Sequence, residues 1–168
     1  LATYWANGSE SYFLRNKPTQ LVWHALALLK QNQLPLILVS NEHARGATEI
    51  FIHCEDQKQL FARIANALSK KKISIHDAQI ITSQDDLVFD SFIVTEQNGL
   101  ALDEIRCEQI QQTLQTELTE PQLTPFAVVK KPIKHQTFKR KTKFRFLVNS
   151  NQNQTSFELF TLDREGLL

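Results

Sequence analysis

Few residues of this 168-residue chain have types and spacing suited to chemistry. The nearest to a polar pair is His76 followed by Asp77, in a stretch that is predicted to be a strand. Adjacent strand residues point to opposite faces, so we do not expect these two side chains to act together on one substrate. The favoured interpretation of His76 is a structural or interface histidine. The sequence has no paired nucleophile and base, no phosphate-binding glycine-rich loop and no HExxH spacing. We therefore predict no catalytic residue and no metal site in this chain.

Charge and cysteine content narrow the class of protein further. The net charge of +1 gives no overall bias toward nucleic acid or membranes. Cys54 and Cys107 lie inside apolar patterns without metal-ligand spacing, which predicts buried, reduced thiols. No apolar run has the length of a membrane span, and no signal sequence is present in the chain. We expect a cytoplasmic protein that has no membrane partner.

The central part of the chain predicts alternating strands and helices that would position any site. Residues 48–54 alternate as a strand, and Asp56 resembles a helix N-cap with Gln59 as its capping-box partner. The helix that follows carries apolar residues at helical spacing. Residues 73–82 and 87–95 predict a hairpin, and Asp103 begins a second helix.

One more strand would complete a β-α-β-β-α-β order, and residues 144–148 alternate as that last strand. The predicted fold class is therefore α+β, a ferredoxin-like arrangement with both helices on one side of a four-stranded antiparallel sheet. Before it, residues 1–16 predict a loop or docked tail, and Pro18 begins an amphipathic helix that reaches Gln31. Residues 35–40 predict an edge strand. These N-terminal elements form a helix-strand connector.

The C-terminal residues predict an internal repeat. Residues 156–162 resemble a first strand again, and residues 163–168 resemble the turn into its helix, as in residues 50–61. We therefore expect a piece of a longer protein. Its domains would be a connector (1–46), a first domain (47–148), and a linker with the start of a second domain (149–168).

Two module types share the predicted strand order. An RNA-recognition motif places aromatic residues on the open sheet face, and Ile50, Phe51 and Ile52 resemble half of its first-strand signature. Its other signature needs a basic residue and glycine on the third strand, which residues 87–94 lack. Glu49 and Asp90 would also bring negative charge near the phosphates. We therefore do not expect nucleic-acid binding.

The C-terminal turn carries a more specific resemblance. Asp163-Arg164-Glu165-Gly166-Leu167-Leu168 resembles the Asp-x-x-Gly-Leu-Leu turn by which ACT domains, which are ligand-sensing regulatory units, open their first helix. Glycine lets the backbone approach a bound amino acid, and the helix N-terminus offers N–H groups to its carboxylate. In the first copy, Gln59 replaces this glycine. The resemblance implies ligand-binding candidates in both copies, namely Asp163, Gly166, Asp56 and Gln59, to which we add His76 and Asp77.

Several motifs in order also resemble the C-terminal region of the bifunctional uridylyltransferase/uridylyl-removing enzyme family. They are residues 12–15, 23–25, 46–52, 74–80 and 90–94. The resemblance covers nearly the whole chain. It implies two glutamine-sensing ACT domains that follow a nucleotidyltransferase domain and a metal-dependent phosphohydrolase domain, in an enzyme that adds UMP to the PII nitrogen-regulatory protein and removes it. Magnesium and all catalytic residues would then lie outside this chain. The implied partners are glutamine, PII, the catalytic domains and a paired ACT domain.

Two alternatives stay open at this point. The chain could be a ferredoxin-like dimerisation module, with Phe51 on an open sheet face. Seven basic residues and no acidic ones lie between Lys130 and Lys143. They are either solvated charge at a loop and strand edge or a docking patch for PII or the catalytic domains. From the resemblance we also predict that this chain alone binds glutamine weakly, because the turn of the first copy lacks glycine.

Overall fold

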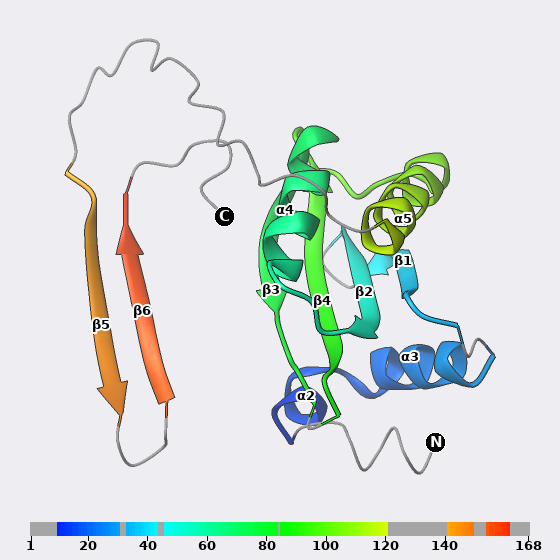
Figure 1. Cartoon of the computed structure of the whole chain (residues 1–168). Coiled ribbons are helices and arrows are strands. Elements are labelled where there is room, and N and C mark those ends of the chain that lie inside the picture. The colour runs from blue at the N-terminus through cyan, green and yellow to red at the C-terminus, as the bar shows by residue number, and fades with distance from the viewer. Residues whose placement is uncertain are drawn as a thin grey trace. The chain divides into compact units, whose positions relative to one another are not determined.

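The computed structural model describes six segments of the chain, residues 10–30, 33–43, 46–83, 85–120, 141–149 and 154–161. They belong to two compact units, which divide after residue 121 (Figure 1). Each unit is described by itself. The candidates Asp163 and Gly166, and nearly all of the basic stretch, lie outside the described residues.

The first unit contains a four-stranded antiparallel sheet (Figure 1). Its strands are β1 (Leu36–His43), β2 (Ala47–Glu55), β3 (Ile73–Gln79) and β4 (Leu87–Glu96), in the spatial order β1-β2-β4-β3. The predicted edge strand and the predicted hairpin are confirmed as β1 and as the pair β3 and β4. Gly46, at φ +66, allows the tight turn from β1 to β2.

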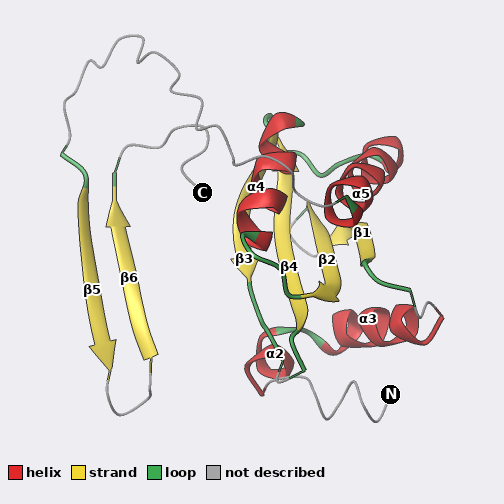
Figure 2. Ribbon diagram, in the orientation of Figure 1, coloured by secondary structure: helices red, strands yellow, loops and turns green. Residues whose placement is uncertain are grey.

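Two helices cover one face of this sheet, α4 (Leu60–Lys70) and α5 (Glu104–Thr119) (Figure 2). Their apolar residues repeat every three or four positions and pack on the inward residues of all four strands. As predicted, Asp103 is the N-cap of α5, and its side chain accepts a hydrogen bond from the backbone N–H of Arg106 at 2.8 Å. This α+β arrangement confirms the predicted ferredoxin-like fold class.

The opposite face of the sheet is covered by N-terminal helices. The predicted helix at Pro18 is confirmed as α3 (Pro18–Lys30). The prediction of a loop over residues 1–16 was wrong for α2 (Glu10–Arg15). Tyr12 on α2 is fully buried, and its hydroxyl lies 2.6 Å from Nδ1 of His24 on α3. These tertiary contacts stabilise a helix of six residues, which would be marginal in isolation.

The covering helices overturn the expectation of an open sheet face. Phe51 is fully buried, and the ring of His24 stacks on it with centroids 3.8 Å apart. Glu49 is also buried and accepts a hydrogen bond from Gln20 of α3 at 2.7 Å. Neither residue is therefore available to an RNA strand or to a second copy at this face.

The position of the last strand was also predicted wrongly. Residues 144–148 lie in β5 (Lys143–Asn149), which pairs with β6 (Gln154–Phe160) in the second unit. In the first unit, β1 occupies the place beside β2. The physical reason is proximity along the chain, because a short turn joins β1 to β2 and closing a short loop costs little entropy. A strand that follows α5 would have to close a much longer loop.

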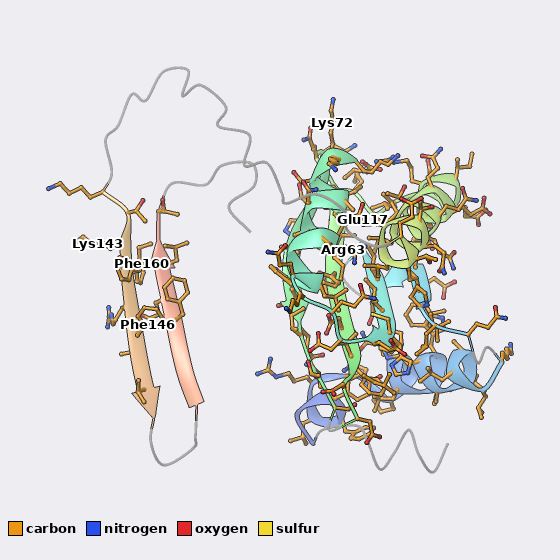
Figure 3. The ribbon with its side chains drawn as sticks, in the orientation of Figure 1. Arg63, Lys72, Glu117, Lys143, Phe146 and Phe160 are labelled. Atoms are coloured by element: carbon orange, nitrogen blue, oxygen red, sulfur yellow. The ribbon has the colours of Figure 1, made fainter. Side chains whose placement is uncertain are left out.

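The second unit is a two-stranded hairpin with one strongly apolar face. Phe144, Phe146, Phe157 and Leu159 lie on this face, and the ring centroids of Phe146 and Phe157 are 5.0 Å apart. Figure 3 shows Phe146 on β5. The opposite face carries an ion pair of 3.3 Å between Arg145 Nε and Glu158 Oε2. All four apolar side chains are at least 40% exposed among the described residues.

Candidate ligand site

Two of the residues that the sequence singled out, Asp56 and Gln59, lie at one end of the first unit's sheet. β2 and β3 both run antiparallel to β4, so they end together where β4 begins. Helix α4 starts at the same end, after a turn over residues 56–59. The backbone N–H of Asp56 donates to the carbonyl of Asp86 at 2.7 Å, which holds the turn against the β3–β4 connection.

The turn into α4 differs from the predicted capping box. The N-cap is Gln59 and not Asp56, and no side chain caps the helix at this residue. Gln59 adopts the left-handed conformation, at φ 62 and ψ 22. Glycine adopts this conformation without a steric cost, whereas other residues pay about 1 kcal/mol or more. The backbone at Gln59 is therefore the kind that favours the glycine of the ACT turn.

Arg63 connects this turn to the end of α5. Its guanidinium donates to Oε1 of Gln57 at 2.6 Å, to the carbonyl of Glu120 at 2.9 Å and to the carbonyl of Glu117 (Figure 3). Its Nε lies 3.6 Å from the Glu117 carboxylate. The residue is only 3% exposed. Arg63 thus satisfies carbonyls that the last turn of a helix leaves without partners. The sequence interpretation missed it, because its helical position gave no sign of a partner on α5.

A groove lies between α4 and the edge strand β3. It is lined by Phe61, Ile75, His76, Asp77, Ala78 and Ile80. The pairing of β3 with β4 slips by one residue between Ile75 and Asp77, which makes His76 a β-bulge. The bulge interrupts the strand alternation between these residues, so the argument that His76 and Asp77 point to opposite faces loses its basis, and both residues line the groove. Nε2 of His76 lies 2.7 Å from Oγ1 of Thr95.

Asp90 is a buried acid at the same end of the sheet. It is fully buried, and its Oδ1 accepts a hydrogen bond from the N–H of Ile81 at 3.1 Å. Its Oδ2 has no hydrogen-bond partner among the residues that the structure describes. Burial raises the pKa of Asp90 to about 7, and the negative charge of Asp56 adds to this effect. The signal in the sequence was a single acid inside an apolar strand, which the sequence analysis considered only as negative charge near the phosphates of an RNA.

Cys54 is a buried thiol near these two acids. Burial raises the pKa of Cys54 to about 12, with further contributions from the charges of Asp90 and Asp56. Because the thiolate is the reactive form, this cysteine is inert at neutral pH. Both cysteines are free and buried, as the sequence predicted.

The predicted site residues of the first unit thus form two groups, one in the turn before α4 and one along the groove beside α4. Asp56 and Gln59 belong to its turn, while His76 and Asp77 line the groove together with Phe61, two residues after Gln59. The walls of the groove are mainly apolar, with exposed polar side chains at one side. In the described segments, no group of three or more His, Cys, Asp or Glu side chains could hold a metal ion. Such a site suits a small ligand that has both apolar and charged parts.

Comparison with known families identifies the central elements. The family model of the ACT domain matches residues 48–105, from β2 to the first turn of α5. Residues 48–105 form an ACT domain. The match includes the turn at Gln59 and every residue that lines the groove. The ACT fold expected from the C-terminal turn is therefore confirmed, although the β1 strand that completes the sheet lies before the matched region.

Relatives of the chain extend beyond this ACT domain. The chain is 45% identical over 165 residues to a bifunctional uridylyltransferase/uridylyl-removing enzyme of Pasteurella multocida, and 41% identical over 165 residues to one of Haemophilus influenzae. The enzyme of the same name from Vibrio atlanticus is 38% identical over 166 residues. Each alignment covers 98% of this chain and 19% of the relative. The chain is therefore similar, along almost all of its length, to about a fifth of these enzymes.

No solved structure matches the chain. Within the described segments, every helix is too short or too polar to span a lipid bilayer.

Proposed function

We propose that this chain is a regulatory, glutamine-sensing part of a bifunctional enzyme that uridylylates the PII nitrogen-regulatory protein and removes the uridylyl group again. The observation that carries the proposal is the similarity of 98% of the chain to enzymes named for both activities, together with the ACT domain inside the aligned region. On this proposal, the nucleotidyltransferase and phosphodiesterase centres, and the magnesium that they need, belong to other domains. The enzyme is cytoplasmic.

The proposed ligand site of the first domain is the groove beside α4. An amino acid carries an ammonium group and a carboxylate on a small apolar frame. The carboxylate of Asp77 suits the ammonium group. The N-terminus of α4, which no side chain of Gln59 caps, suits the carboxylate, although the N–H of Leu60 already donates to the carbonyl of Gln57 at 3.1 Å. Phe61 and Ile75 supply apolar contact, and His76 is a further hydrogen-bonding group at the rim. The second copy would offer Asp163 and Gly166 at the equivalent turn.

The proposed mechanism is a change in the arrangement of ACT domains. Glutamine regulates the enzyme only if it binds one arrangement more tightly than the other, because the difference in binding free energy is what shifts the equilibrium. β3 is an edge strand beside the groove, so pairing of two ACT domains along it would place a neighbour next to the ligand. Helices α2 and α3 pack against the other face of the sheet. A conformational change in this domain would therefore shift these helices, and through them the N-terminal part of the protein.

Calorimetric titration with glutamine tests the proposal. We expect binding by a protein that contains both copies and weak or undetectable binding by the 168-residue chain. In the longer protein, Gly166→Gln should weaken binding by about tenfold or more, because a side chain hinders close approach of the backbone. Lys58→Gln in the first turn is the matched control and should have little effect. Absence of glutamine binding by the longer protein would exclude glutamine sensing, and tight binding by the short chain would exclude the assignment to the second copy.

Dimerisation without ligand sensing is the second candidate function. The observation that favours it is the pair of edge strands β1 and β3, whose outer backbone groups could pair with another chain. Sedimentation of the chain with and without glutamine separates the two functions. A dimer that is indifferent to glutamine supports the second candidate, and a glutamine-dependent change in mass supports the first.

A further inference from the structure

The hairpins β1–β2 and β5–β6 pair their residues in the same register, and equivalent residues are a constant number of positions apart in the sequence. The five pairs of β1 and β2 from Leu36↔His53 to Ser40↔Glu49 have equivalents in β5 and β6 that lie 107 residues further along, as Phe144 does from Ile37. The register of β1 and β2 shifts only beyond Ser40, before the pair His43↔Ala47. The equivalent pairs are Leu36↔His53 and Lys143↔Phe160, Ile37↔Ile52 and Phe144↔Leu159, Leu38↔Phe51 and Arg145↔Glu158, Val39↔Ile50 and Phe146↔Phe157, and Ser40↔Glu49 and Leu147↔Ser156.

The same separation relates the two ACT turns. Residue 163 lies 107 residues after Asp56, and residue 166 lies 107 residues after Gln59. The repeated unit therefore does not begin with the strand that precedes the ACT turn. It begins one strand earlier, at β1 in the first copy and at β5 in the second.

The first copy shows what covers the inner face of such a hairpin. Ile37, Val39, Ile50 and Ile52 pack against α4 and α5. Nε2 of Gln111 on α5 also donates to the carbonyl of Ile37 at 2.8 Å. The strand β1 thus lies beneath α5 in the position where the β-α-β-β-α-β order would place its last strand.

In the second copy the equivalent face is apolar and exposed. Phe144, Phe146, Phe157 and Leu159 occupy the positions of the four packed residues, and their exposed fractions are 68%, 62%, 55% and 40%. An isolated two-stranded hairpin is marginally stable in water, and an apolar face needs a partner to become stable. The other face carries the Arg145–Glu158 ion pair where the first copy has Leu38 and Phe51, together with Leu147 and Phe160, so it is more polar than the first face.

We infer that the β5–β6 hairpin is the beginning of a second ACT unit, and that its apolar face docks a pair of amphipathic helices equivalent to α4 and α5. Each unit takes the strand beside its first ACT strand from the residues before it, and not from those after its second helix. Residues 121–142 then link two units instead of completing the first. This inference shares one assumption with the proposed function, namely that the chain is part of a longer protein.

The strand assignment is tested in the 168-residue chain alone. Ile37→Ala should lower the melting temperature of the first unit by about 10 °C or more, since it opens a cavity in the core. Phe144→Ala, its equivalent, should change that melting temperature by less than about 2 °C. Far-UV circular dichroism follows the melt because the helices α2 to α5 belong to the first unit. Equal destabilisation by the two variants would assign β5 to the first unit and overturn the inference. This outcome does not depend on glutamine.

The docked helices are tested by hydrogen exchange. In the longer protein, the amides of β5 and β6 should be protected at least about 100-fold more than in the 168-residue chain, and Phe146→Asp should abolish this difference. Leu147→Asp, on the opposite face, is the matched control and should preserve it. Equal protection in both proteins would overturn the inference. So would protection in the short chain that rises with its concentration, which would make a second copy of this chain the occupant.

Discussion

The hairpins β1–β2 and β5–β6 share a register but differ in what their outer faces carry. In the first, Leu38 and Phe51 form a cross-strand pair beneath α2 and α3, and Phe51 is completely buried. In the second, the same pair is Arg145 and Glu158, which are exposed. The inner faces are apolar in both. If β5–β6 opens a second ACT unit, as inferred above, the difference means that such a unit needs cover on one face only and that α2 and α3 are an addition in the first.

Exchanging the outer pairs should have the largest effect. Leu38→Arg combined with Phe51→Glu places an ion pair beneath α3, where desolvation and lost packing should cost the first unit at least about 3 kcal/mol. Urea unfolding measures this cost. The reciprocal exchange, Arg145→Leu with Glu158→Phe, should leave the stability of the first unit unchanged. A small effect of the first exchange would show that α3 does not hold the outer face, and the comparison of the hairpins would fail.

Substitution of the buried acid Asp90 should have the next largest effect, at the sheet face that α4 and α5 cover. Its pKa is about 7 in the folded state and near 4 when unfolded, so the folded state retains a proton that the unfolded state has lost between these pH values. The free energy of unfolding therefore falls as pH rises from 4 to 7. Asp90→Asn removes the ionisable group and with it this pH-dependent fall in stability. The substitution should raise the free energy of unfolding at pH 8 by roughly 2 to 4 kcal/mol, with little effect at pH 4.

Urea unfolding at both pH values checks the Asp90 prediction. A difference between the two proteins that stays constant from pH 4 to pH 8 would contradict it.

The helix pair above the first hairpin depends on Arg63. Arg63→Met leaves Gln57 and the carbonyls of Glu117 and Glu120 without this donor and should cost about 2 to 3 kcal/mol. Arg106→Met is the matched control, because Arg106 pairs with Glu96 at 2.7 Å in a more exposed position and should cost about 1 kcal/mol or less. Chemical denaturation compares the two variants. Equal costs would mean that the helix pair is held by packing alone.

The smallest expected effect concerns the turn that follows each hairpin. Gln59→Gly should stabilise the first unit by about 1 kcal/mol, because residue 59 has φ 62 and glycine relieves the strain. Lys58→Gly, next to it, serves as the control and should give no stabilisation. Thermal melting measures both. Destabilisation by Gln59→Gly would indicate that the turn in the two copies does not need the same backbone conformation.

Particular residues show how far the sequence could predict this structure. Asp103 before a helix with apolar residues at every third or fourth position predicted α5 and its N-cap correctly, since both signals are local. The capping box at Asp56 also fitted a local rule, but the left-handed backbone at Gln59 displaced the helix start. At His76, the alternation rule failed because a bulge depends on the pairing with β4. The site residues were therefore found by type, whereas their grouping around the groove was not.

The sequence by itself determined the order and type of the elements, the apolar face of each and the repeated ACT turn, because these depend on residues close together along the chain. Tertiary structure decided which strand completes the sheet, which face α3 covers and which acid is buried. These outcomes depend on loop closure and on competition between distant segments for the same apolar surface. The residues 144–148 illustrate the division, since their alternation predicts a strand equally well for either unit. Only the pairing of β5 with β6 placed them in the second.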